Sequence, residues 1–230
     1  SKDLDFRVES DGNANMLVVD GGNNRVGIGT NSPAQVLDVQ GTALMERSRL
    51  STNDGTTYWD FRRDSSTGHL VISDDGLGDV ITISQTGGEV TMAKQPAFRV
   101  KPSSNQSNFA IDGWVDVAFG NEAFDVGDNF ASSTFTAPVT GKYQLNLQLR
   151  LNNVDSAANF YQARINTSNQ IFYTTIDPDF GQDAAYWTFI LSIFTDMDAS
   201  DTATVGIFQS LGTSQTDVSN DSHFSGYLVA

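Results

Sequence analysis

The residues of this chain best suited to chemistry are aspartates that gather in two short polar segments. Asp177, Asp179 and Asp183 lie within one seven-residue segment, and a second group occupies residues 196–201. Ca²⁺ requires several oxygen ligands close together, so the first group is a candidate metal site and calcium is the ion it would hold. Neither group matches the helix-loop-helix calcium pattern. Asp is also common in turns, so solvated turns are the alternative.

Histidine is the other candidate ligand, and the chain has two, His69 and His223. They are far apart in sequence, so we expect neither a catalytic dyad nor a shared metal within one chain. If chains assemble around a three-fold axis, three copies of His69 could meet and hold an ion. The alternative is an ordinary exposed or hydrogen-bonded histidine.

The usual signatures of an enzyme are absent from the sequence. There is no nucleophile elbow, phosphate loop or paired-histidine zinc motif. A general acid needs a carboxyl group among apolar neighbours, whereas these aspartates lie among Gly, Asn and Ser. We therefore predict no catalytic residues and no enzyme, with cleavage of a polysaccharide as the remaining catalytic alternative.

Composition excludes several other classes of partner. The net charge of −15 disfavours nucleic acid, because phosphates would be repelled. No apolar run approaches the roughly 20 residues that span a bilayer, so no membrane insertion is expected. The first residues lack the basic and then apolar character of a signal peptide. With no cysteine, disulfides cannot stabilise the fold; burial and assembly must do so.

The elements that position these residues are predicted to be strands throughout. In residues 142–151 Tyr and Leu alternate with Lys, Gln, Asn and Arg, which is the period of a half-buried strand. Apolar and turn-forming residues predict further strands at 97–101, 132–137, 159–166, 170–176, 185–196, 202–209 and 223–229. The composition changes near Pro96, so we predict an N-terminal domain of residues 1–95 and a C-terminal domain of residues 96–230.

One predicted strand, residues 186–194, is apolar on both faces. Trp187, Phe189, Leu191 and Ile193 share one face, and Ile190 and Phe194 lie on the other. Burial of both faces requires a neighbour on each side. The second neighbour is either another protomer or a loop of the same chain.

Residues 1–95 contain an internal repeat with a period of about 53 to 55 residues. Residues 5–7 recur at 60–62, and residues 17–21 recur at 70–76. Each unit is predicted to form two or three short strands, too small to bury much apolar surface alone. Three chains wound together would supply the missing contacts. Residues 42–50 are compatible with either a short helix or further strand.

The C-terminal domain resembles the globular head of complement component 1q. Residues 135–151 and 222–229 match the two signatures of that family, residues 196–205 resemble its acidic turn, and residues 121–127 fall where it has an early hairpin. The resemblance implies a ten-strand jelly roll related to tumour necrosis factor. It also implies an obligate homotrimer that binds partners and does not catalyse.

A second resemblance involves residues 26–41, Val-Gly-Ile-Gly-Thr-Asn-Ser-Pro-Ala-Gln-Val-Leu-Asp-Val-Gln-Gly. This segment is similar to one that recurs in bacteriophage tail fibres, where it commonly precedes a receptor-binding or chaperone domain. The resemblance implies a fibre shaft on a virion surface and contacts with other virion proteins. The predicted fold is therefore an all-β homotrimer with an intertwined shaft and a jelly-roll head.

If the head follows the family topology, loops 152–158, 177–184 and 210–221 lie at its exposed end. Polar loops on rigid strands are suited to ligand recognition. The candidate receptor-binding residues are Asn152, Asn153, Asp155, Asp177, Asp179, Phe180, Asp183, Thr213, Gln215 and Asn220.

The sequence thus predicts a trimeric virion fibre whose head attaches to a host-surface glycan or protein. Two alternatives remain. The first is a virion decoration or fibre segment whose head only drives trimerisation, and the second is an adhesin on a bacterial surface.

Overall fold

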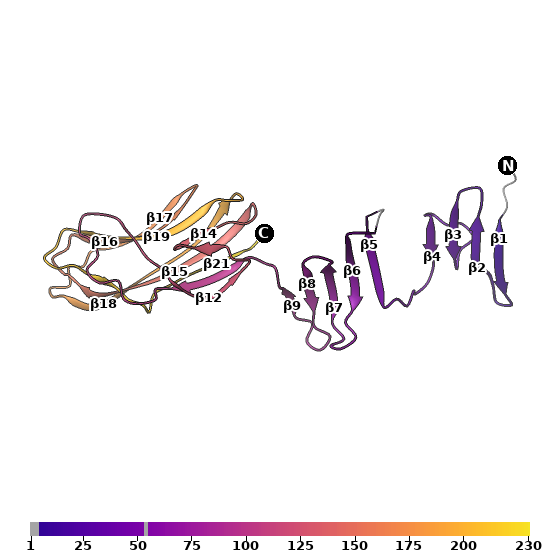
Figure 1. Cartoon of the computed structure of the whole chain (residues 1–230), viewed down its shortest axis with the longest axis horizontal. Coiled ribbons are helices and arrows are strands. Elements are labelled where there is room, and N and C mark those ends of the chain that lie inside the picture. The colour runs from indigo at the N-terminus through magenta and orange to yellow at the C-terminus, as the bar shows by residue number, and fades with distance from the viewer. Residues whose placement is uncertain (1–4, 53–54) are drawn as a thin grey trace. The chain divides into compact units, whose positions relative to one another are not determined.

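A computed structural model describes residues 5–52 and 55–230, and every regular element in them is a β-strand (Figure 1). Within these residues no helix is long and apolar enough to cross a membrane. The chain divides into two compact units, residues 1–90 and 91–230. The predicted domain boundary, between residues 95 and 96, lies a few residues beyond this division.

The first unit contains two separate sheets. The four-stranded sheet has the order β1-β2-β3-β4, and the five-stranded sheet has the order β5-β6-β7-β8-β9. The strands are β1 (Phe6–Ser10), β2 (Asn13–Asp20), β3 (Arg25–Ile28), β4 (Leu37–Val39), β5 (Arg47–Ser51), β6 (Tyr58–Arg63), β7 (Leu70–Asp74), β8 (Gly78–Ile83) and β9 (Val90–Met92).

The sequence repeat corresponds to a structural repeat. Strands β1, β2 and β3 form an antiparallel meander, and β6, β7 and β8 form another. Phe6 pairs with Val19 in the first meander, and Phe61 pairs with Ile72 in the second. The sequence of residues 42–50 was compatible with either a helix or a strand. The structure has no helix there, and residues 47–50 belong to β5.

The second unit is a sandwich of two antiparallel sheets with the main orders β12-β10-β21-β15-β18 and β13-β14-β19-β16-β17. Its strands are β10 (Ala97–Lys101), β11 (Val115–Asp116), β12 (Asn121–Val126), β13 (Phe130–Ala131), β14 (Thr134–Thr136), β15 (Gly141–Val154), β16 (Phe160–Thr167), β17 (Ile171–Ile176), β18 (Ala184–Met197), β19 (Thr202–Ser210), β20 (Asp217–Val218) and β21 (His223–Leu228). We call the sheets the β15 sheet and the β19 sheet.

The order of these strands is that of a jelly roll. The chain crosses between sheets from β14 to β15, from β15 to β16, from β17 to β18 and from β18 to β19. The last strand, β21, returns to pair with the first, β10, as in a Greek key. Residues 121–127, which fall where the complement 1q family has an early hairpin, form β12, which pairs with β10, and the turn at Gly127, which leads into the other sheet.

The core lies between the two sheets. Tyr143 and the leucines of β15 are buried, as their alternation predicted. They meet an aromatic cluster in which the ring centroid of Phe98 lies 4.6 Å from that of Phe135 and 5.1 Å from that of Phe224. A Cβ atom at Gly226 would lie 2.5 Å from Leu145 Cδ2, so only glycine fits there.

Candidate functional site

The three loops that were predicted to share one end of the head are joined by hydrogen bonds. Asn153 Nδ2 donates to Asp217 Oδ2 over 3.1 Å, which connects the end of β15 to loop 210–221. The backbone N–H and hydroxyl of Ser156 donate to Asp183 Oδ1, both over 2.9 Å, which connects loop 152–158 to loop 177–184. Residues of all three loops line one shallow pocket of about 330 Å³.

Asp155 holds two of these loops together from the inside. Its side chain is buried, and its carboxylate accepts hydrogen bonds from the backbone N–H groups of Ala157, Thr213 and Ser214. Burial alone would raise the pKa of Asp155, but the N–H donors outweigh it and hold the pKa below its usual value. A buried carboxylate cannot contact a receptor, so we replace the predicted contact role of Asp155 with a positioning role.

A buried hydroxyl pair continues this network and was not predicted from the sequence. Tyr161 Oη lies 2.6 Å from Thr216 Oγ1 and accepts a hydrogen bond from the backbone N–H of Asp155. Thr216 Oγ1 also donates to the carbonyl of Asn153 over 3.2 Å. Since Tyr161 belongs to β16, the loops are anchored to a strand of the β19 sheet. Nothing in the local sequence signals this pairing, because 55 residues separate the two hydroxyls.

An exposed aromatic pair lies beside the same loops. Phe180 is 41% exposed and stacks on Trp187, with ring centroids 5.6 Å apart and planes 27° apart. Trp187 itself is 37% exposed. The sequence identified Phe180 as a candidate receptor residue, whereas it identified Trp187 only as one of the apolar residues of strand 186–194. Stacked aromatic rings that water still reaches are suited to packing against a flat apolar surface of a ligand.

The remaining candidate residues lie on the same loops. Asp179, Thr213, Gln215 and Asn220 are exposed, whereas Asn152 is half-buried. Gln215 Nε2 donates to the carbonyl of Phe109, and the backbone N–H of Asn220 donates to Asn105 Oδ1. The structure therefore brings the predicted residues to one end of the head. Their role in binding a receptor stays a prediction.

The predicted calcium cluster is not formed within one chain. No group of three or more His, Cys, Asp or Glu side chains is arranged to hold a metal ion in the described parts of the sequence. Asp177 Oδ1 accepts a hydrogen bond from the backbone N–H of Asp179, and Asp183 Oδ1 accepts one from the backbone N–H of Ser156. Asp177 thus stabilises a local turn, and Asp183 connects two loops. His69 Nδ1 accepts the N–H of Gln85 over 3.1 Å, and an ion shared by three copies of His69 stays a prediction.

The outer face of the β15 sheet carries exposed apolar side chains. On β18, Tyr186, Ile190 and Phe194 are 60%, 64% and 58% exposed, whereas Phe189 and Ile193 on the opposite face are buried. The alternative that loops of the same chain cover Ile190 and Phe194 is therefore wrong.

Several polar residues on the same face are paired with one another within the chain. Gln144 Nε2 donates to Ser192 Oγ over 2.9 Å, and Ser192 Oγ donates to Asn146 Oδ1 over 2.8 Å. Arg150 forms an ion pair with Asp221 and lies over the ring of Tyr186. These contacts join β15 to β18 and to the segment before β21, beside the apolar strip.

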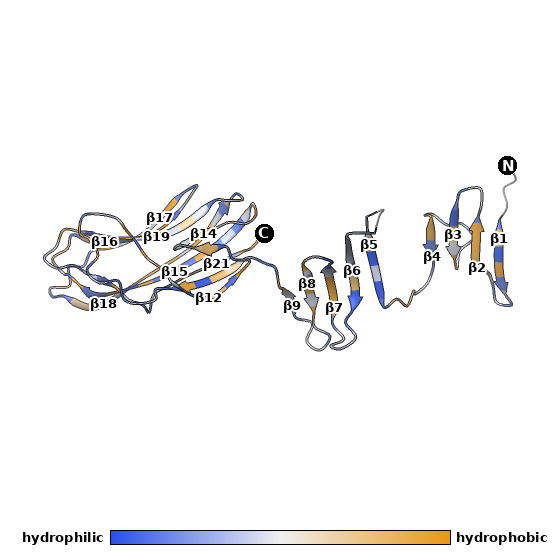
Figure 2. Cartoon of the chain, in the orientation of Figure 1, coloured by the Kyte–Doolittle hydropathy of each residue, from blue (hydrophilic) through white to orange (hydrophobic). Residues whose placement is uncertain are grey.

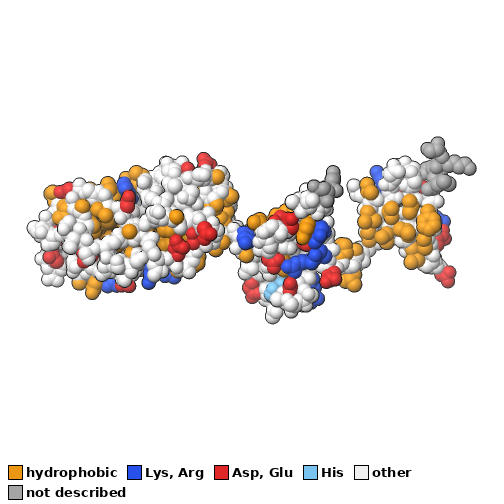
Figure 3. Space-filling model, in the orientation of Figure 1, with side chains coloured by type: hydrophobic (Ala, Val, Ile, Leu, Met, Phe, Trp, Pro, Cys, Tyr) orange, Lys and Arg blue, Asp and Glu red, His pale blue; other side chains and the backbone are white. Residues whose placement is uncertain are grey.

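Each sheet of the first unit is apolar on one face. In the four-stranded sheet, Phe6, Val19, Val26 and Leu37 pair in one continuous row across all four strands. In the five-stranded sheet, the row is Phe61, Ile72 and Ile81. Figure 2 colours much of β2 and β7 as hydrophobic, and Figure 3 shows a patch of hydrophobic side chains over the four-stranded sheet.

The opposite face of the five-stranded sheet is charged. Asp60 is buried between Arg49, whose Nε lies 2.9 Å from Asp60 Oδ1, and Arg47, whose Nη1 lies 3.5 Å from Asp60 Oδ2. The side-chain hydrogen bond from Arg49 holds the pKa of Asp60 below its usual value. This sheet is amphipathic across its thickness, with ion pairs on one face and exposed apolar residues on the other.

No second layer covers the apolar faces. Val18 and Val71 are the only buried Val, Ile, Leu, Met or aromatic side chains in residues 5–52 and 55–90. Phe6, Leu37, Leu50, Phe61 and Leu70 are between 42% and 61% exposed. A stable domain packs at least two layers around a core, so these faces form a candidate assembly surface.

The strand order defines the head as an antiparallel jelly-roll sandwich, and comparisons with solved structures return proteins of similar shape. The globular domain of zebrafish complement 1qA matches with 16% identity and a TM-score of 0.44, over 59% of this chain and 98% of that domain. Murine APRIL at pH 8.5 matches with 13% identity and a TM-score of 0.44, over 59% of this chain and 100% of the other. Murine APRIL at pH 8.0 gives 12% identity and a TM-score of 0.45, with the same coverage.

No protein-family model matches the chain, and no curated protein matches it. The similar structures include a complement 1q globular domain, the family that the sequence of the head resembles. None of these results bears on the resemblance of residues 26–41 to bacteriophage fibres, which stays a prediction.

Proposed function

We propose that this chain is the subunit of a homotrimeric fibre on a virion surface, whose C-terminal head attaches to a receptor on a host cell. The observation that supports assembly is that both sheets of the first unit have an apolar face that no other part of this unit covers. Covering one Leu, Ile or Phe side chain is worth about 1.5–3 kcal/mol. Several such residues on each sheet make the isolated chain unfavourable and a multi-chain assembly favourable.

The occupant that fits these faces is a second and a third copy of the same chain. The apolar rows run across whole sheets, so three copies arranged around one axis would turn their apolar faces towards each other. The charged side of the five-stranded sheet would then face water, where Asp60 and its arginines are tolerated. Three copies, and not two, follow from the resemblance of the head to a trimeric family. The exposed strip of Tyr186, Ile190 and Phe194 is the matching assembly surface on the head.

Receptor attachment is supported by the loop end of the head. Asp155 joins two of its loops, the hydrogen bonds between Ser156 and Asp183 join the third, and the exposed Phe180–Trp187 pair lies beside them. Three copies on one fibre present three such ends, and this multiplicity raises the avidity of a weak contact. The virion location is supported only by the resemblance of residues 26–41 to phage fibres.

Two measurements test the proposal on the whole chain. Light scattering should give about three times the 24.9 kDa mass of one chain; a monomer at micromolar concentration would contradict the assembly. The chain should also bind one glycan on an array, or cells of one strain in a panel of bacteria. A trimer that binds neither would leave the alternative in which the head serves only to assemble the fibre.

A further inference from the structure

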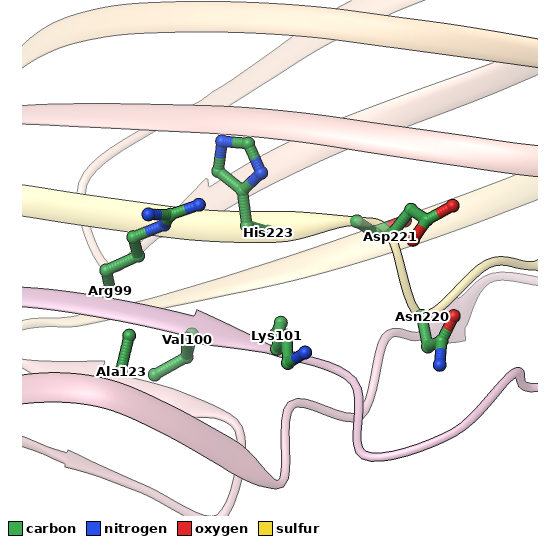
Figure 4. A pocket seen from close by; sticks show the side chains of 8 residues that line it. Arg99, Val100, Lys101, Ala123, Asn220, Asp221 and His223 are labelled. Carbon is green, nitrogen blue, oxygen red and sulfur yellow. The ribbon is translucent and has the colours of Figure 1, made fainter.

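A pocket of about 350 Å³ opens on the outer face of the β15 sheet, where β10 and β21 lie side by side. Arg99 and Lys101 of β10 and His223 of β21 line it, together with Asn220 and Asp221 from the segment that leads into β21. Figure 4 shows Arg99 and His223 extending from neighbouring strands, with Asp221 on the segment that leads into the strand of His223. The alternation of β10 places Arg99 and Lys101 on this face, because Phe98 and Val100 are buried in the core.

The two cations in this pocket differ from most others in the chain. Among the residues that the structure describes, seven Arg and Lys side chains form ion pairs with carboxylates, namely Arg7, Arg47, Arg49, Arg62, Lys142, Arg150 and Arg164. Within residues 5–52 and 55–230, the side chains of Arg99 and Lys101 have neither an ion pair nor a hydrogen bond. The chain carries 28 acidic and 13 basic residues, so an unpaired cation is unexpected. Here two unpaired cations, Arg99 and Lys101, line the same pocket.

The acid in the pocket lining does not neutralise these cations. Asp221 Oδ2 lies 2.6 Å from Arg150 Nη1 and is committed to that ion pair. Burial lowers the pKa of His223, and the positive charge of Arg99 lowers it further. The ring is therefore neutral at pH 7, so it can form a hydrogen bond but adds no third positive charge to the pocket. The pocket therefore holds two positive charges without a counter-charge, against an overall charge of −15. The guanidinium of Arg99 has a fork of donors that matches the oxygens of an oxyanion, and the ammonium group of Lys101 adds a second positive charge to the lining.

We propose that this pocket binds an oxyanion, the carboxylate or sulfate group of an anionic ligand. Its volume falls within the range for small-molecule sites, about 300–1,000 Å³, and so accommodates a sugar-sized acid. A carboxylate side chain on another copy of this acidic chain has the same chemistry. The proposal goes beyond receptor attachment by the loops, because Asn220 is the only residue that the pocket shares with the candidate receptor residues.

Titration of the whole chain with D-galacturonate, with neutral D-galactose as the matched probe and inorganic sulfate as competitor, tests the proposal. Galacturonate should bind saturably, sulfate should compete, and galactose should not bind. The double variant Arg99→Gln/Lys101→Gln should weaken binding at least tenfold, and Arg99→Lys/Lys101→Arg should retain most of it. Lys142→Gln, which removes a cation already paired with Asp196, should leave binding unchanged.

The mass of each variant by light scattering distinguishes the two sources of the oxyanion. If galacturonate does not bind but Arg99→Gln/Lys101→Gln lowers the oligomeric mass while Lys142→Gln does not, the oxyanion is a carboxylate of a neighbouring copy. Equal binding of galactose and galacturonate would overturn the proposal. So would an absence of binding together with an unchanged mass in a double variant that circular dichroism shows to be folded. Host-cell attachment is measured separately, so its failure leaves this result intact.

Discussion

The carboxylate of Asp155 accepts a hydrogen bond from the backbone N–H of Ser214 over 2.7 Å, although 59 residues separate them in the chain. The neighbouring N–H groups of Ala157 and Thr213 donate to the same carboxylate. One buried side chain thus fixes the conformation of two loops at the end of the head. The loop that carries Phe180 is joined to these two loops through Ser156 and Asp183.

Replacing Asp155 should destabilise the head more than replacing an exposed aspartate. Asp155→Ala leaves three backbone N–H groups without their acceptor, and hydrogen bonds to a charged group are worth about 1.5–3 kcal/mol each, with partial compensation by water. We expect a loss of roughly 2–4 kcal/mol in the free energy of unfolding, measured by denaturant titration. Asp179→Ala is the control and should change it by less than about 0.5 kcal/mol, since the Asp179 side chain is exposed. Equal losses in both variants would contradict the positioning role.

The same carboxylate should make the stability of the head depend on acid. The folded-state pKa of Asp155 is lowered, so its contribution is fully present above the unfolded-state value, about 3.9, and is lost as the pH falls through the folded value. Unfolding midpoints measured between pH 7 and pH 2 should therefore fall less steeply in Asp155→Asn than in the wild-type chain below about pH 4. Parallel curves would show that Asp155 is not ionised in the folded head.

A charge on the apolar face of the five-stranded sheet should prevent assembly. Ile72 lies between Phe61 and Ile81 on that face, so Ile72→Asp would bury an unpaired carboxylate at a cost of several kcal/mol. Light scattering should show a mass near that of one chain. Thr82→Asp is the matched control on the opposite face, where Thr82 pairs with Val71, and it should keep the oligomeric mass. Dissociation by both variants, or by neither, would contradict the assignment of the faces.

The aromatic pair at the loop end should matter for attachment and not for assembly. Phe180→Ala and Trp187→Ala each remove one of the stacked rings, and truncation of an aromatic residue at the centre of a contact commonly costs 2 kcal/mol or more, about thirtyfold in affinity. The affinity for the glycan or cell type that the wild-type chain recognises should fall about thirtyfold, while the oligomeric mass stays unchanged. Tyr173→Ala, an aromatic residue on β17 outside this pair, is the control. Unchanged binding in the Phe180 and Trp187 variants would place the receptor site elsewhere.

Local patterns predicted most of the strands of the head. The alternation of residues 142–151 indicated both the strand and its buried face, and β15 has that face buried. Strand β18 shows the limit of predicting burial from residue periodicity. Its two apolar faces predicted burial on both sides, yet Ile190 and Phe194 are exposed within one chain. Periodicity identifies which residues share a face, but what covers that face depends on distant segments or on other chains.

The candidate sites were predicted unevenly for the same reason. The three polar loops were identified from composition and order, and hydrogen bonds do join them. Asp155 looked like a surface residue because its neighbours are Ser, Ala and Asn, whereas its burial depends on Thr213 and Ser214. Arg99 and His223, more than a hundred residues apart, become neighbours only through the pairing of β10 with β21.

The sequence by itself determined the all-β character of the chain, its repeat, the core face of β15 and the absence of disulfides, because these depend on residue type and spacing. Tertiary structure decided which sheet each strand joined and which carboxylate became an internal anchor. It also decided where two cations were left without a partner and which apolar faces remained uncovered. Those outcomes depend on contacts between segments distant in the chain, and spacing along a strand contains no information about them.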